Sequence, residues 1–187
     1  MSVKLVEIKN YDEAMQGYAI QKNLWPDCAD FSHFKFALDE NNPYYKYYFI
    51  KAGKDNAGII GTYLEKASAD CIWLGWYGIL PEFRSKGYGK SALLQIIDIC
   101  KEYKVFKNFR AYTSNYDSIA FGVYESVMDL KEDYVNKDDK VDYEVYIYTK
   151  SLSKEKALPW SNKYIGINEY DKIASDMEDQ LANLKLK

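Results

Sequence analysis

The residues best suited to do chemistry lie in one short loop, residues 81–90, with the sequence PEFRSKGYGK. Two glycines, Gly87 and Gly89, stand directly before a helical pattern, and the cations of the loop are Arg84, Lys86 and Lys90. The first amides of a helix lack partners within the helix and lie at the positive end of its dipole. Phosphate is a natural ligand of such a helix start, and glycines let the backbone approach it closely. The loop is therefore predicted to bind a phosphate group.

Two common kinds of phosphate site do not fit this loop. A nucleotide P-loop has four residues between its glycines and ends in Gly-Lys-Ser or Gly-Lys-Thr, whereas one residue separates Gly87 from Gly89. A dinucleotide-binding turn has Gly-x-Gly-x-x-Gly after the first strand of a parallel unit. Here Ala92 takes the place of the third glycine, and several strand patterns precede the loop. Both kinds of nucleotide site are excluded.

The segment RSKGYG, residues 84–89, resembles the acyl-CoA pyrophosphate loop of the GNAT superfamily of N-acetyltransferases, Arg/Gln-x-x-Gly-x-Gly/Ala. The flanking segments, ILP at residues 79–81 and KSALL at residues 90–94, resemble the family as well. The resemblance implies that acetyl-CoA is the co-substrate, with no metal. It implies that the pyrophosphate contacts these residues: Arg84, Ser85, Lys86, Gly87, Tyr88, Gly89 and Lys90.

A second segment resembles the family in the next predicted helix. Members often carry Asn-x-x-Ala-x-x-x-Tyr there; the Asn contacts the CoA arm and the Tyr hydroxyl protonates the departing thiolate. Ala120 and Tyr124 match this motif. Asp117 occupies the Asn place, and Asn115 lies two residues earlier. The resemblance therefore implies Tyr124 as the catalytic acid and leaves Asn115 and Asp117 as alternatives for the contact with CoA.

The chemistry of acetyl transfer accounts for this layout. An amine that attacks a thioester needs a deprotonated nucleophile, a stabilised oxyanion and a proton for the leaving sulfur. The resemblance implies that backbone groups around Tyr77 and Ile79 bind the pantetheine, where the strand before the loop and the strand after the helix splay apart. A tyrosine, with an ordinary pKa of about 10, is suited to protonate a thiolate of similar basicity.

The general base stays open. Many family members carry a carboxylate on the strand before the loop, but residues 73–80 contain none. Glu65 and Glu82 are the nearest carboxylates in the sequence, and a chain of water molecules would serve without either. The missing carboxylate and Asp117 keep two alternatives to an enzyme open: a non-catalytic acyl-CoA-binding module and an interaction protein on the same fold.

The acceptor is expected to be a primary amine of a small molecule or a peptide. In the family its identity depends on the first two helices and on the region of the last two strands. Aromatic residues are frequent around the first two helices: Trp25, Phe31, Phe34, Tyr44 and Tyr45. They favour either an aromatic-walled pocket for a cationic amine or ordinary core packing.

The scaffold that positions these residues is predicted to be one mixed α/β domain over residues 1–150. Alternating apolar residues predict strands at residues 3–8, 45–52, 57–66, 71–80, 109–113, 131–135 and 141–150. Helices are predicted after a cap at Asn10 or Asp12, after a cap at Ser32, over the apolar steps from Leu93 to Tyr103, and at residues 118–128. The order β-α-α-β-β-β-α-β-α-β-β is that of a GNAT-like mixed central sheet.

Residues 151–187 are predicted to be a linker followed by an amphipathic helix. Its apolar residues recur at helical spacing: Ile173, Met177, Leu181 and Leu184. An isolated helix of this size is marginal in water. The apolar stripe must therefore be buried, either on the domain itself or against a second copy in a homodimer.

Composition limits the classes of partner and the cellular compartment that we expect. A net charge of −3 argues against a nucleic-acid binder, which needs a cationic surface. No segment reaches the roughly 18 consecutive apolar residues of a membrane span, and the N-terminus lacks the apolar core of a signal peptide. The cysteines form no Cys-x-x-Cys pair, and His33 is the single histidine. A cytoplasmic protein without a metal site is expected.

Overall fold

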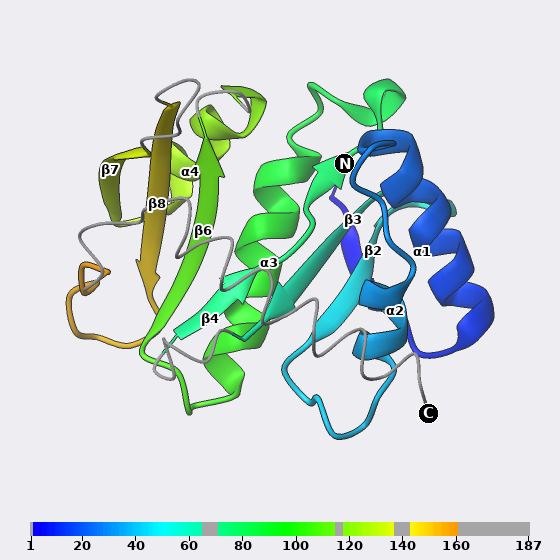
Figure 1. The fold of residues 1–187 in the computed structure, drawn as a ribbon, viewed down its shortest axis with the longest axis horizontal. Helices are drawn as coiled ribbons and strands as arrows, with labels where there is room; N and C mark the ends of the chain where they lie inside the picture. Colours follow the sequence, from blue (N-terminus) through cyan, green and yellow to red (C-terminus); the bar gives the residue numbers. More distant parts are fainter. Residues whose placement is uncertain (1, 65–70, 115–117, 137–142, 161–187) are drawn as a thin grey trace.

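The computed structural model describes residues 2–64, 71–114, 118–136 and 143–160, which form a mixed sheet with helices on both faces (Figure 1). The strands are β1 (Lys4–Glu7), β2 (Lys46–Ala52), β3 (Asp55–Tyr63), β4 (Cys71–Leu74), β5 (Gly78–Ile79), β6 (Asn108–Ser114), β7 (Leu130–Asn136) and β8 (Tyr143–Ser151). The helices are α1 (Tyr11–Leu24), α2 (Ser32–Ala37), α3 (Tyr88–Glu102) and α4 (Phe121–Val127), with 3₁₀ turns at Pro81–Phe83 and Ser118–Ala120. The predicted fold class is confirmed.

The sheet has the order β1-β2-β3-β4-β6-β8-β7, with β5 paired to β3. The short strand β4 joins two halves, because it pairs antiparallel with β3 and parallel with β6. Beyond Leu74 the two halves of the sheet diverge. β5 stays paired with β3, while residues 111–114 of β6 pair with β8 alone among the described strands. This is the divergence that the resemblance implied, and it is visible in Figure 1 between β6 and β3.

The single strand predicted at residues 71–80 is wrong, since the structure divides it into β4 and β5. A one-residue shift in the pairing with β3 explains the break. The Gly75 amide still donates to the Gly61 carbonyl at 2.8 Å, in register with the pair Thr62–Leu74. At Gly78 the register has moved by one residue, to the pair Ile59–Gly78, so the segment stays beside β3 and an extra residue divides the strand as in a β-bulge. An apolar run carries no sign of where such a break falls.

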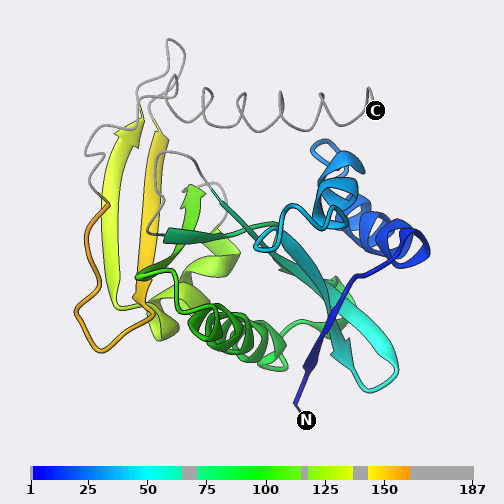
Figure 2. The same cartoon turned by 90° about the horizontal axis from the view of Figure 1, so that it is seen from below.

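Two layers of helices enclose the sheet (Figure 2). On one face, α3 and α4 bury the largest apolar cluster, which includes Ile72, Ile96 and Phe109. On the other face, α1 and α2 cover a second cluster around Phe34, Tyr47 and Ile59. The apolar steps predicted for α3 are confirmed, because Leu93, Ile96, Ile97 and Cys100 are all buried. The sheet thus separates the phosphate loop at the start of α3 from the α1–α2 side.

The starts of α1 and α2 differ in how well the sequence predicts them. The Asn10 side chain accepts a hydrogen bond from the Glu13 amide at 2.9 Å, which confirms one of the two predicted caps. The predicted Ser32 cap is wrong, because Ser32 is already helical. Phe31 is the N-cap and makes no side-chain cap contact, while the carboxylate of Asp30, one residue earlier, accepts from the Ser32 amide at 2.8 Å. An Asp two residues before Ser32 gives the same local turn.

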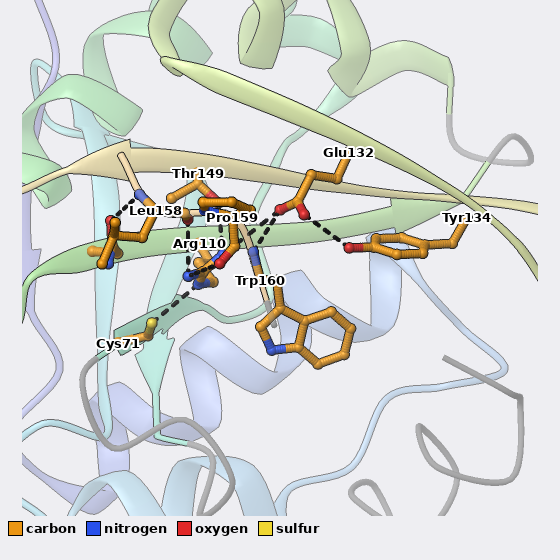
Figure 3. A network of polar contacts seen from close by, with 9 residues as sticks. Cys71, Arg110, Glu132, Tyr134, Thr149, Leu158, Pro159 and Trp160 are labelled. Carbon is orange, nitrogen blue, oxygen red and sulfur yellow. Dashed lines mark hydrogen bonds and ion pairs between the residues drawn. The ribbon is translucent and has the colours of Figure 1, made fainter. Parts of the chain in front are cut away.

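A buried cation fixes the segment that follows β8 (Figure 3). Arg110 on β6 is 2% exposed. It donates to Cys71 Sγ at 3.0 Å, Thr149 Oγ1 at 2.9 Å and the Leu158 carbonyl at 3.1 Å. The Glu132 carboxylate lies 3.9 Å from the guanidinium and accepts from the Trp160 amide at 2.8 Å and the Tyr134 hydroxyl at 2.9 Å. The network holds residues 158–160 against the face of the sheet that α3 does not cover.

Several predictions lie outside the described residues. They concern Glu65, Asn115, Asp117 and the C-terminal helix with its apolar stripe. The homodimer contact and the domain boundary at residue 150 therefore stay predictions. The cytoplasmic setting stays a prediction as well. Within the part of the chain that the structure describes, no helix is long and apolar enough to cross a lipid bilayer.

Candidate functional site

The loop between β5 and α3 has the geometry of an anion site. Gly87 is the N-cap of α3 with φ +75°, a left-handed conformation that favours glycine, and no described side chain caps the helix there. The Ser91 amide donates to the Gly87 carbonyl at 3.1 Å. The amides of residues 88–90 therefore precede the helical ladder. A Cβ on Gly87 would meet no described atom within 4 Å, so the space beside this helix start is open.

The second glycine of the motif serves another purpose. A Cβ on Gly89 would lie 2.6 Å from the Tyr77 hydroxyl and 3.8 Å from an Ile79 side-chain carbon. Gly89 therefore makes room for β5, not for an anion alone. Burial raises the pKa of Tyr77, so its hydroxyl stays protonated at neutral pH and can act only as a neutral hydrogen-bonding group.

The predicted cations surround this helix start and are exposed. Arg84 Nε donates to the Ile79 carbonyl at 2.9 Å. Lys86 Nζ donates to the Glu82 carbonyl at 3.1 Å and lies 5.3 Å from the centre of the Phe83 ring. These contacts fold both side chains back on the loop, where their charge adds to the positive end of the helix dipole.

The other predicted loop residues contribute differently. Ser85 has φ +60°, a left-handed conformation that is unusual for a residue with a Cβ. Strained backbone of this kind recurs at ligand-binding loops. Lys90 is exposed, whereas the Tyr88 side chain is buried among the residues that α3 packs against the sheet. For Tyr88 the backbone amide is the group available to a phosphate.

The free edge of β5 faces the divergence of the sheet. The Leu80 amide donates to the Ala57 carbonyl of β3 at 2.9 Å. Because alternate residues of an antiparallel strand direct their backbone groups to opposite sides, those of Ile79 point away from β3. The Ile79 carbonyl indeed meets Arg84 rather than another strand. Its amide is placed to bind an extended chain, which is the role that the resemblance implies for pantetheine.

Tyr124 lies next to this edge. It belongs to α4 and is 5% exposed. Its ring centroid is 6.3 Å from that of Tyr77 and 5.2 Å from that of Tyr148. The fold thus joins Gly89, Tyr77 and Tyr124 in one continuous set of contacts from the start of α3 to α4. Asn115 and Asp117, the alternatives for the CoA contact, lie outside the described residues.

Sequence reasoning did not find Tyr148. Its hydroxyl is buried and has no hydrogen-bond partner among the described residues, and burial, with a smaller contribution from Glu125, raises its pKa to about 12. Apolar alternation in β8 cannot distinguish this tyrosine from the other ring-bearing residues of the strand. Only the contact with Tyr124 marks it.

None of the carboxylates weighed for the general base lies at the pantetheine edge in the described part of the chain. β4 and β5 carry none in their sequence, and Glu82 is exposed in the 3₁₀ turn before Arg84. Glu65 lies outside the described residues. His33 lies on the α1–α2 side of the sheet, with its ring 6.0 Å from that of Trp76.

Some residues expected around the acceptor pack elsewhere. Phe34 and Tyr45 are buried in the core beneath α2. Tyr44 packs on the opposite side of the sheet, with its ring 4.9 Å from that of Phe106. Of the five aromatic residues that the sequence suggested for an acceptor pocket, Trp25 and Phe31 are the two that are partly exposed on the α1–α2 side.

Comparison with known proteins gives one family match and several structures of the same fold. The chain matches the model of the acetyltransferase (GNAT) family over residues 9–129. No curated protein matches the sequence. A GNAT-family acetyltransferase structure from Desulfovibrio desulfuricans is 18% identical, with a TM-score of 0.68, and the match covers 81% of this chain and 99% of that one.

Two further structures share the fold. The microcin C7 self-immunity acetyltransferase MccE, in complex with acetyl-CoA and AMP, is 17% identical, with a TM-score of 0.61 and 80% and 92% of the two chains covered. The ribosomal-protein-S18-alanine N-acetyltransferase from Escherichia coli is 14% identical, with a TM-score of 0.61 and 87% and 99% covered. These likenesses show the fold alone. The family model spans most of the chain, and the chain belongs to the acetyltransferase (GNAT) family.

Proposed function

We propose that the chain transfers the acetyl group of acetyl-CoA to a primary amine of a small molecule or a peptide, by direct attack on the thioester. The observation that carries the proposal is the start of α3, where Gly87 has φ +75°, no described side chain caps the amides, and the adjacent space is open. Such a helix start fits the pyrophosphate of CoA. The acetyl-CoA bound to MccE supports this choice of co-substrate.

The chain's own residues have distinct tasks in this reaction. The amides of residues 88–90, with Arg84 and Lys86, hold the pyrophosphate, while the free edge of β5 at Ile79 binds the pantetheine. Tyr124 holds the proton that the sulfur receives. Binding of this kind fixes the thioester at one place in the divergence between β5 and β6, which lowers the entropic part of the barrier.

The bonds and protons balance without a metal or a redox partner. The amine nitrogen forms a bond to the acetyl carbon, the bond from that carbon to sulfur breaks, and its electron pair stays on the sulfur. Tyr124 gives its hydroxyl proton to the thiolate. The nitrogen loses one proton on becoming an amide, and this proton returns to Tyr124 through solvent.

A non-catalytic acyl-CoA-binding module is the second candidate, favoured by one observation: β4 and β5 carry no carboxylate that could serve as base. Purified protein, acetyl-CoA and a panel of amines decide between the two, with thiol release followed by a colour reagent and the product identified by mass spectrometry. Amine-dependent thiol release that Tyr124→Phe suppresses supports the enzyme. If calorimetry shows that acetyl-CoA binds but no amine causes thiol release, the result supports the binding module.

A further inference from the structure

Three partly exposed rings meet on the face of the sheet opposite α3. The ring centroids of Trp25 and Trp76 are 5.0 Å apart, and those of His33 and Trp76 are 6.0 Å apart. Trp25 follows the end of α1, His33 belongs to α2, and Trp76 lies between β4 and β5. We name these three residues the Trp25 cluster.

The Trp25 cluster rests on the strand that carries the proposed pantetheine edge. A Cβ on Gly78 would lie 2.7 Å from the Trp25 ring, so the indole packs directly on the β5 backbone. Tyr77 and Ile79 pack with the α3 side, whereas Trp76 packs with the α1–α2 side. Because side chains alternate along an extended segment, one strand separates the cluster from the proposed position of the thioester.

The charges around the cluster favour a cation. Residues 25–35 contain two carboxylates, Asp27 and Asp30, and one lysine, Lys35, whose Nζ lies 5.6 Å from the centre of the Phe31 ring. Asp30 is near enough to Tyr45 that its charge adds to burial, the main cause, in raising the pKa of that tyrosine. Indole faces bind ammonium groups through their quadrupole. Acidic residues and indoles together select a positively charged ligand.

The arginines are used elsewhere, which excludes a common way to bind an anionic acceptor. The chain has two, Arg84 and Arg110. Arg84 lies in the phosphate loop with Nε on the Ile79 carbonyl. Arg110 is held in the buried network around Glu132. Neither can form the bidentate pair that recognises a carboxylate or a phosphate at the Trp25 cluster.

A buried amide lies one helical turn before the cluster. Gln21 precedes Trp25 by four residues, is 0% exposed, and its backbone carbonyl accepts from the Trp25 amide at 2.8 Å. Neither its Oε1 nor its Nε2 has a hydrogen-bond partner among the described residues. A buried polar group left without partners destabilises the fold. This amide offers one acceptor and one donor group one turn before Trp25, and it needs a ligand or a water molecule to satisfy it.

We propose that the Trp25 cluster and Gln21 form the acceptor site for a primary ammonium on an aromatic or apolar body that bears no anionic group. The inference rests on the proposed function and names its substrate class. The indoles stack on the body and attract the ammonium, and the Gln21 oxygen accepts from it. The ammonium releases one proton to water before its nitrogen attacks the thioester, because only the neutral amine carries the electron pair that forms the new bond. The acceptor then reaches the thioester from the side of the strand that α3 and the phosphate loop leave clear.

Three amines test the substrate class in the same assay of thiol release. 2-Phenylethylamine has both the ammonium and the aromatic body, ethylamine lacks the body, and phenylalanine adds a carboxylate. We expect kcat/KM for 2-phenylethylamine to exceed the other two at least about tenfold, equivalent to roughly 1.4 kcal/mol. Equal or better use of phenylalanine, of ethylamine or of a peptide α-amine overturns the inference.

Three variants test the residues. Trp76→Ala should remove the preference for 2-phenylethylamine, and Trp76→Phe should retain most of it. Gln21→Leu removes an unpartnered amide, so it should raise the melting temperature and also raise KM for the amine; a residue with a structural role alone would not raise KM. A preference that survives Trp76→Ala, or an unchanged KM in Gln21→Leu, contradicts the site.

Calorimetry with acetyl-CoA alone separates the two levels of the proposal. Each variant should bind acetyl-CoA within about twofold of the wild type, because the Trp25 cluster lies across β5 from the phosphate loop. A wild type that binds no acetyl-CoA overturns the proposed function together with this inference. A wild type that binds acetyl-CoA and acetylates only amines of other classes overturns the inference alone.

Discussion

The Tyr77 hydroxyl lies 2.6 Å from the point where a Cβ on Gly89 would stand. This contact ties β5 to the first turn of α3 and so fixes the phosphate loop between them. It also explains why the second glycine of the motif is required in this chain. The ring of Tyr77 then continues to Tyr124, whose centroid is 6.3 Å away.

The effect of Gly89→Ala on the free energy of unfolding should therefore change sign when the residue at position 77 is changed. In the wild type the new methyl group meets the hydroxyl, and overpacking of about 1–3 kcal/mol exceeds the gain of up to ~1 kcal/mol from better helix propensity. With Tyr77→Phe the nearest remaining ring atom is 3.7 Å away, an ordinary contact. Urea denaturation should show Gly89→Ala destabilising the wild type and stabilising the Tyr77→Phe protein. Destabilisation of the same size in both would contradict the contact.

Gly87 allows a matched test of charge at the helix start. Asp and Asn have similar size, and both tolerate the left-handed conformation found at φ +75°. Gly87→Asp should weaken acetyl-CoA binding at least about tenfold more than Gly87→Asn, since like charges ~4 Å apart near a surface repel by several kcal/mol. Calorimetric titration of the two folded variants measures the difference. Equal affinities would mean that the pyrophosphate does not bind there.

Much of the scaffold follows from local sequence patterns. The Asn10 cap and the apolar steps of α3 each depend on neighbours within a few residues, and each is found where it was predicted. The strand predicted at residues 141–150 is found as β8, but both of its faces are buried, because Tyr146 and Tyr148 are buried as well as Val145 and Ile147. The phosphate loop is local as well, because its glycines and cations are consecutive. Patterns of this kind report which face of an element is buried.

The parts that the sequence does not predict depend on contacts between distant segments. The break between β4 and β5 is a one-residue shift of their register against β3, which an apolar run does not encode. The Trp25–Trp76 contact brings α1 to the β4–β5 segment. In the sequence, Arg110 is one cation in a predicted strand. Only the folded chain shows the groups that accept its hydrogen bonds. Tertiary packing decides all three.

Tyr124→Phe should lower kcat on the order of a hundredfold with little change in acetyl-CoA affinity, because it removes only the proton that the sulfur needs. Tyr148→Phe is the matched control. Its ring contacts Tyr124 at 5.2 Å, and its buried hydroxyl has no partner among the described residues. Turnover of Tyr148→Phe should match that of the wild type. Equal turnover in both variants would mean that the Tyr124 hydroxyl does not supply the proton and that the side chain serves in packing.

Arg110→Met should destabilise the fold by about 3–5 kcal/mol, because it leaves Glu132 without its buried partner. The matched control is Lys101→Met: Lys101 pairs with Asp98 at 2.9 Å on the exposed face of α3. An exposed pair contributes at most about 1 kcal/mol. Urea denaturation should therefore separate the two variants clearly. Similar losses in both would mean that the Arg110 network adds no more stability than a surface ion pair.

The central claim is that acetyl-CoA binds to the start of α3, and calorimetric titration of the wild type with acetyl-CoA tests it most directly. The account predicts saturable binding of one acetyl-CoA per chain, together with a melting temperature that rises with ligand concentration, since a ligand that binds only the folded state stabilises it by mass action. No heat of binding and no change in melting temperature at millimolar acetyl-CoA would contradict the claim.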